Sequence, residues 1–111
     1  MGKNAMFDDI SNANYEIGKL VNDKNRVLNN ISEKMAYNAC SKATLTDEQI
    51  EMFREFNGDC VEKTKRVDKD LAEIKEFMVN GSLKETRVRQ SDAMSTLRRI
   101  IEHGERTLSF I

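Results

Sequence analysis

The chain has 111 residues, 33% of them charged, and a formal net charge of −1. This length predicts a single helical domain over residues 1–111, and two cysteines with one histidine are too few for a clustered zinc site or a di-metal bundle. No apolar run approaches the roughly 18 residues that a membrane-spanning helix needs. The N-terminus also lacks the apolar segment of a secretory signal, so we expect a cytoplasmic protein without membrane insertion.

The first predicted helix covers about residues 5–41. Two neighbouring apolar stripes run along it at spacings of three, four and seven residues, and together they form a face wide enough to contact two other helices. The first stripe contains Ile10, Ile17, Val21, Leu28, Ile31 and Met35, and the second contains Ala13, Leu20 and Val27.

The second predicted helix covers residues 47–79. Thr46 and Gln49 have the spacing of a capping box at its start, and Asn80-Gly81 is typical of a helix end. Its stripe has an average spacing of 3.5 residues, which favours left-handed packing of helices along a common seam. The stripe contains Ile50, Phe53, Asn57, Cys60, Thr64, Val67, Leu71, Ile74 and Met78.

The third predicted helix covers residues 83–111, and Ser82 with Glu85 suggests a second capping box. Met94 follows Met78 by sixteen residues, which is not a multiple of seven, so the seam does not continue through the turn and we expect a hairpin. The stripe contains Leu83, Arg87, Gln90, Met94, Leu97, Ile101, Gly104, Leu108 and Ile111.

These segments predict an all-α fold, an elongated antiparallel three-helix bundle of coiled-coil type. No proline interrupts them, and short connections favour antiparallel neighbours. In architecture, three heptad-bearing helices in a chain of this length resemble a spectrin-type repeat. The tryptophans that mark that repeat are absent, so the resemblance implies a helical rod and no particular partner.

Few residues offer side chains suited to catalysis, chiefly Cys40, Cys60 and His103. The two cysteines lie on different predicted helices at an offset too large for a disulfide, and reduced thiols are typical of a cytosol-like compartment. A catalytic centre needs a cleft that gathers a nucleophile and a base, and a narrow bundle offers none. We therefore expect no enzymatic activity, no cofactor and no bound metal.

Several large apolar residues fall outside the narrow stripes. They either widen the core or form a second apolar face for a partner helix. Polar residues on the stripes, such as Asn57 and Gln90, would specify register or partner number. We therefore predict a non-enzymatic helical interaction protein, a scaffold, adaptor or small subunit that self-associates or pairs with a partner helix. The candidate partner-binding residues are Phe56, Val61, Phe77, Ile100 and Phe110.

An alternative hypothesis is a small regulator that binds nucleic acid, or an enzyme acting on it, through an arginine-rich third helix. Arginine suits phosphate contacts, but acidic residues are interleaved, no aromatic residue alternates with the basic ones, and the sequence pI is about 5.9. A solvated, ion-paired face is favoured over nucleic-acid binding. The basic-face candidates are Arg87, Arg89, Arg98, Arg99 and Arg106.

The first helix is predicted to be the least stable by itself, because asparagine is a weak helix former whose amide competes for backbone groups. We expect its backbone amides to exchange with solvent fastest in a native-state hydrogen-exchange experiment. Uniform protection along the chain would contradict this. Its asparagines are Asn4, Asn12, Asn14, Asn22, Asn25, Asn29, Asn30 and Asn38.

Overall fold

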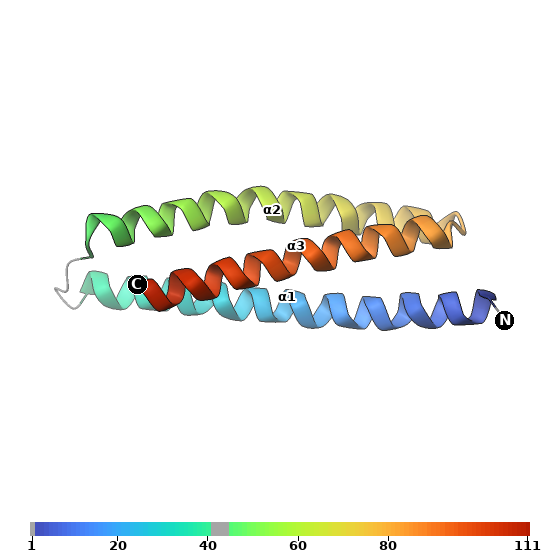
Figure 1. The fold of residues 1–111 in the computed structure, drawn as a ribbon, viewed down its shortest axis with the longest axis horizontal. Coiled ribbons are helices and arrows are strands. Elements are labelled where there is room, and N and C mark those ends of the chain that lie inside the picture. Colours follow the sequence, from blue (N-terminus) through green and yellow to red (C-terminus); the bar gives the residue numbers. More distant parts are fainter. Residues whose placement is uncertain (1, 41–44) are drawn as a thin grey trace.

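The computed structural model describes residues 2–40 and 45–111, which form three helices and no strand (Figure 1). They are α1 (Gly2–Cys40), α2 (Asp47–Val79) and α3 (Leu83–Phe110). The rod measures 61 × 19 × 17 Å; α1 and α3 run in one direction and α2 in the other (Figure 1). The predicted elongated all-α bundle is thus confirmed, while Ser41, the predicted last residue of the first helix, lies outside the described residues.

The start of α2 has the predicted capping box. The Thr46 hydroxyl accepts a hydrogen bond from the Gln49 backbone N–H (3.1 Å), and the Gln49 side chain accepts one from the Thr46 N–H (2.9 Å). The amide nitrogen of Gln49 also donates to the carbonyl of Phe110 at 3.1 Å. One side chain therefore caps α2 and ties its start to the end of α3.

The turn between α2 and α3 closes by a Schellman motif. Gly81 has φ of +75°, the Ser82 N–H donates to the Phe77 carbonyl (2.8 Å), and the Gly81 N–H donates to Met78 (3.2 Å). The predicted capping box of Ser82 and Glu85 is wrong, because Ser82 makes no side-chain cap bond. In a capping box the Glu85 carboxylate would accept a hydrogen bond from the Ser82 backbone N–H. That N–H already donates to the Phe77 carbonyl.

The central element is α3, which packs against both α1 and α2, whereas no described Cα atoms of α1 and α2 approach within 8 Å. Two neighbours require a wide buried face. The buried face of α3 is therefore wider than the predicted narrow stripe and is centred beside it. Four residues of that stripe are only half-buried, namely Arg87, Met94, Ile101 and Leu108. The buried residues of α3 are Thr86, Gln90, Ala93, Thr96, Leu97, Ile100, Gly104 and Thr107.

Three of these buried residues are threonines, whose hydroxyls bond within α3. Each hydroxyl of Thr86, Thr96 and Thr107 donates to the carbonyl four residues earlier, at 2.8 to 3.0 Å. The polar atoms are thus satisfied inside the helix. Threonine behaves here as a small packing residue that lets the neighbouring helices approach closely.

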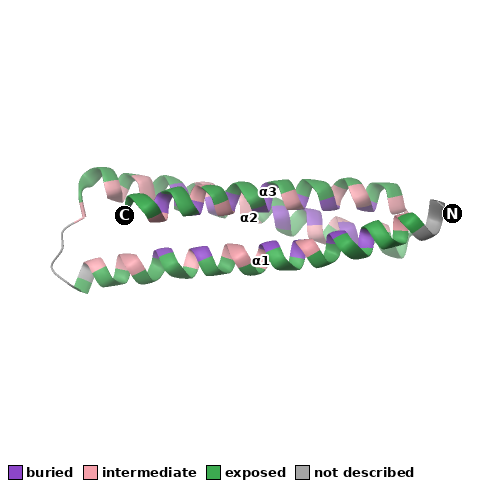
Figure 2. Cartoon of the chain, turned by 60° about the horizontal axis from the view of Figure 1, so that its bottom comes forward, coloured by how far each residue is buried: buried purple, intermediate pink, exposed green. Residues whose placement is uncertain are grey.

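The core consists of two clusters along the rod, and buried residues of the helices face one another between the ribbons (Figure 2). One cluster contains Ile17, Leu20, Val67, Ile74, Ala93 and Leu97. The other contains Val27, Ile31, Phe56, Cys60, Ile100 and Ile111. Both combine residues of all three helices, so α1 shares a core with α2 although their backbones stay apart.

Gln90 aligns α1 with α3. Its side chain is fully buried, and its amide nitrogen donates to the Ile10 carbonyl (3.0 Å) and the Asn14 side-chain oxygen (2.7 Å). The Arg87 guanidinium donates to the Gln90 amide oxygen at 3.1 Å. Because a shift of α1 along α3 would leave a buried amide unpaired, this network favours one register.

Gly104 sits where α3 lies closest to its neighbours. A β-carbon there would lie 2.6 Å from Val27 Cγ1 and 3.3 Å from the Phe56 ring. Val27 is β-branched and stiff, so it cannot move aside cheaply. Glycine is thus required at this position by close packing, in spite of its low helix propensity.

The variant Gly104→Ala is expected to lower the free energy of unfolding by about 1–3 kcal/mol through overpacking. Gly58→Ala is the matched control, since Gly58 is exposed on α2 and a β-carbon there meets nothing within 4 Å. It should stabilise the protein by about 0.5–1 kcal/mol. Urea unfolding of both variants checks this, and stabilisation by Gly104→Ala would contradict the packing described.

Candidate functional site

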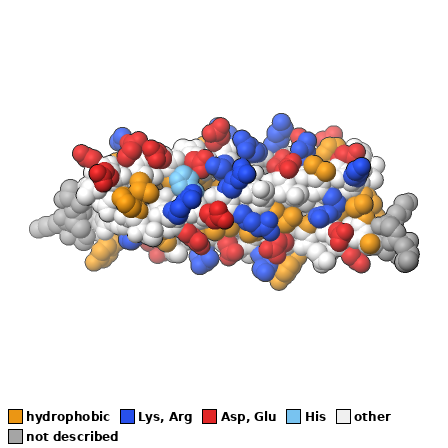
Figure 3. Space-filling model, viewed as in Figure 1, with side chains coloured by type: hydrophobic (Ala, Val, Ile, Leu, Met, Phe, Trp, Pro, Cys, Tyr) orange, Lys and Arg blue, Asp and Glu red, His pale blue; other side chains and the backbone are white. Residues whose placement is uncertain are grey.

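A charged hollow of about 410 Å³ lies between α2 and α3. The face in Figure 3 carries interleaved basic and acidic side chains over these helices. Within the hollow, Arg89 forms ion pairs with Glu73 and Asp92, whereas the other three basic residues form no ion pair with a described residue. The lining residues are Arg66, Lys69, Asp70, Glu73, Arg89, Asp92, Ser95, Thr96 and Arg99.

Asp70 is the one described residue with a buried side-chain polar atom that lacks a hydrogen-bond partner. Its side chain borders the hollow, the residue is 6% exposed, and Oδ2 accepts no hydrogen bond. Burial, followed by the negative charge of Asp92 and then that of Glu73, raises the pKa of Asp70, and the positive charges of Arg89 and Arg66 oppose the shift. An unpaired carboxylate oxygen in this position is costly, so the site favours a proton or a donor group beside Asp70.

A smaller hollow of about 280 Å³ lies at the hairpin end of the rod. Its apolar wall consists of Phe77 from α2 and Val88 from α3, with Lys84, Glu85 and Arg89 around it. Val88 is 53% exposed, and Val79, just beyond Phe77, is 87% exposed. We call Phe77 and Val88 the hairpin-end surface.

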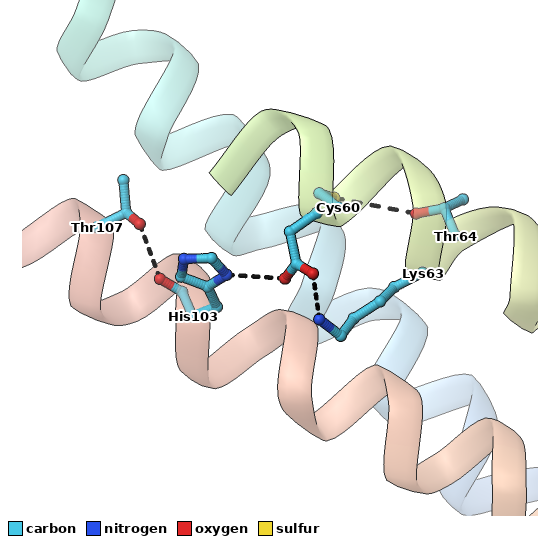
Figure 4. A network of polar contacts seen from close by, with 6 residues as sticks. Cys60, Lys63, Thr64, His103 and Thr107 are labelled. Carbon is cyan, nitrogen blue, oxygen red and sulfur yellow. Dashed lines mark hydrogen bonds and ion pairs between the residues drawn. The ribbon is translucent and has the colours of Figure 1, made fainter. Parts of the chain in front are cut away.

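His103 belongs to a polar network that joins α3 to α2 (Figure 4). Its Nδ1 is 2.8 Å from Asp59 Oδ2, and the Lys63 ammonium donates to Asp59 Oδ1. Hydrogen bonds from Lys63 and then from His103 hold the pKa of Asp59 below its usual value, against the effect of burial. The Phe56 ring packs edge-on against the imidazole at 5.2 Å between centroids.

The network does not join His103 to a thiol. Cys60 is buried and its sulfur lies 3.9 Å from the Thr64 hydroxyl, while Nδ1 of the imidazole faces Asp59. Cys40, the other free cysteine, is exposed near the end of α1. The arrangement therefore orients an imidazole and links two helices, and the expectation that the chain is not an enzyme stays a prediction.

The predicted apolar anchors separate into two groups. Phe56 and Ile100 are 2% and 1% exposed and belong to the core, so they widen the core and must be removed from the partner-binding candidates. Phe77 is half-buried, while Val61 and Phe110 are 50% and 46% exposed. Of these five candidates, Phe77 alone lines one of the two hollows described. It does so with Val88, which the stripe patterns did not single out.

The predicted basic residues do not act as one face. Arg89 is paired with two carboxylates and Arg87 is bonded to Gln90. Arg98, Arg99 and Arg106 are exposed, and Arg99 alone of these three borders the charged hollow. Nucleic-acid binding stays an untested hypothesis, with fewer available arginines than the sequence suggested.

Asp70 was missed by the sequence reasoning, although a signal for it exists. It lies fourteen residues after Phe56 and seven before Phe77, on the same heptad line. A carboxylate on the heptad line that also carries Phe56 and Phe77 indicates a position turned towards α3. Whether Asp70 finds a hydrogen-bond donor depends on which residues of α3 lie opposite it, and only the packing of the helices determines those residues.

No known protein family, curated protein or solved structure matches this chain. In residues 2–40 and 45–111, no three His, Cys, Asp or Glu side chains gather so that they could hold a metal ion. Among the described helices, none combines the length and the apolar character that crossing a bilayer requires.

The variant Asp59→Asn tests the network through its pH dependence. Because folding lowers the pKa of Asp59, its stabilising effect is complete above the ordinary aspartate pKa of about 4 and is lost as the pH falls through the lowered value. Asp59→Asn should lower the free energy of unfolding at pH 7 by about 1 kcal/mol, since the site is partly solvated. The loss should shrink as the pH falls below about 4.

Urea unfolding between pH 7 and pH 2 measures this effect. Asp68→Asn is the control, because Asp68 is exposed on the same helix and forms neither a hydrogen bond nor an ion pair with another described residue. Equal losses in the two variants, or a loss in Asp59→Asn that persists undiminished in acid, would contradict the assigned network.

Proposed function

We propose that this protein is a non-enzymatic helical interaction module that pairs with a helix of a partner protein through the hairpin-end surface. The observation that carries the proposal is the hollow between Phe77 and Val88, where apolar side chains stay accessible at the end of a well-packed rod. Exposed apolar side chains around a concavity are typical of protein interfaces.

The dimensions suit a single apolar side chain from the partner. About 280 Å³ accommodates a leucine or phenylalanine, and burying such a side chain contributes about 1.5–3 kcal/mol. One anchor in a pocket surrounded by weaker contacts is a common design of helix-in-groove interfaces.

The rim of this hollow supplies orientation. Lys84 and Glu85 carry opposite charges, and Arg89 is fixed by two carboxylates. A partner helix with complementary charges beside its anchor would be preferred over one with like charges. Other exposed apolar residues, such as Tyr15 and Tyr37 on α1, line neither of the two hollows described.

A photo-reactive amino acid placed at Val88 is expected to capture one predominant protein in the cells that produce this chain. The matched control places the same amino acid at Val61, which is almost equally exposed (50% against 53%) but borders no described hollow. Adducts are separated by mass and identified by peptide sequencing.

The expected result is an adduct from position 88 that is absent from position 61 and is lost when Phe77→Asp is added. An adduct with a second copy of the chain would identify the partner as the protein itself. The same adducts from both positions, or none from position 88, would overturn the proposal.

A further inference from the structure

We propose that the charged hollow between α2 and α3 binds a phosphate group that carries a proton, held by Arg66, Lys69 and Arg99, with Asp70 accepting the hydrogen bond of that proton. The ligand is inorganic phosphate, or a small phosphate monoester that takes up a proton when it binds, because the second pKa of a monoester is about 6. This inference concerns a different site from the hairpin-end surface and does not depend on the partner proposed for it.

The hollow lies at a gap in a regular series of contacts between α2 and α3. His103 bonds to Asp59, and Arg89 pairs with Glu73. On each helix the two members lie fourteen residues apart, and the chains are antiparallel. Halfway between them, seven residues from each, α2 carries Arg66 and α3 carries Thr96, both in the wall of the hollow.

At this midpoint α2 therefore carries a cation where the other two positions carry an acid, and α3 carries a threonine. The Thr96 hydroxyl already donates to the Asp92 carbonyl. Arg66, Lys69 and Arg99 are exposed residues that line one hollow from two helices, and they form no ion pair with a described residue. An oxyanion between them would supply the missing negative charge, and guanidinium groups are suited to binding it with paired hydrogen bonds.

Asp70 selects among oxyanions. A carboxylate beside a fully deprotonated anion such as sulfate is repelled, and its Oδ2 stays without a donor. Inorganic phosphate keeps a P–OH group at neutral pH, and that group can donate to the carboxylate. A single proton shared between Asp70 and phosphate thus satisfies both partners, whereas sulfate brings no proton.

The size of the hollow allows more than the ion alone. Its volume of about 410 Å³ falls within the range of small-molecule sites, about 300–1,000 Å³. The space left beside a bound phosphate would accept a short organic substituent, as in phosphoserine. Glu73 and Asp92 share the single positive charge of Arg89. The whole lining has four basic and three acidic residues, so the hollow keeps a formal charge of +1.

The test titrates the whole chain with inorganic phosphate, sulfate and phosphoserine at pH 7 and constant ionic strength. Calorimetry gives the affinities, and backbone amide NMR shifts locate the site. Wild-type protein should bind phosphate at least about tenfold more tightly than sulfate, since a buried carboxylate left facing an anion is strongly unfavourable. A further titration at pH 6, where about half of a monoester carries its P–OH group, decides the source: tighter binding of phosphoserine than of inorganic phosphate at that pH would identify an ester.

Asp70→Asn is the decisive variant. Its side-chain amide donates to either anion, so the affinity ratio of phosphate to sulfate should fall to about threefold or less, mainly through a gain in sulfate binding. Arg99→Ala should weaken phosphate binding by about tenfold. Arg98→Ala is the matched control, because Arg98 is exposed and lies outside the hollow, and it should leave the affinity unchanged.

Three outcomes would overturn the proposal. They are the absence of phosphate-dependent shifts around Asp70 at millimolar concentration, an unchanged selectivity in Asp70→Asn, and equal losses in Arg98→Ala and Arg99→Ala. Circular dichroism confirms folding of each variant, and Arg66→Ala replaces Arg99→Ala if the latter unfolds. Asp70→Asn removes an unpaired buried charge, so it is expected to fold at least as well as the wild type.

Discussion

The packing of α3 against two helices at once is the constraint on which the rest of the structure depends. One helix face must serve α1 and α2 together, and their backbones stay apart, so both cores form through α3. Close approach on two sides demands small side chains, which explains Ala93 and Gly104 at fully or nearly fully buried positions. It also explains the buried threonines of α3. Their hydroxyls donate to backbone carbonyls four residues earlier, so burying them carries only a small free-energy penalty.

The same constraint makes buried polar groups decisive for register. Gln90 lies on the part of α3 that faces α1, and its amide finds two acceptors there and a donor in Arg87. Asp70 lies on the side of α2 that faces α3 and finds no donor for Oδ2. The hydrogen-bonded Gln90 amide stabilises one alignment of the helices. The Asp70 carboxylate, in contrast, has an oxygen for which no described residue supplies a hydrogen-bond donor.

The sequence was sufficient for features that depend on local spacing. The helix ends near residues 47, 79 and 83 and the Thr46 cap follow from a few neighbouring residues, and the structure has them. Features set by packing were not predictable in this way. The buried face of α3 is rotated towards Ile100 because two neighbours share it. Phe56 of α2 is core because it packs in one cluster with Val27 of α1 and Ile100 of α3. The N–H of Ser82 was taken by the Schellman bond to Phe77.

Arg89 keeps the two candidate sites distinct. It lines both the charged hollow and the hairpin-end hollow, and its guanidinium is held by Glu73 from α2 and Asp92 from α3. Its guanidinium is therefore a hydrogen-bonded group in the shared wall of the two hollows. Polar and charged residues dominate the lining on one side of Arg89, and Phe77 and Val88 lie on the other. One groove between two amphipathic helices can therefore present a polar and an apolar surface within two turns of each other.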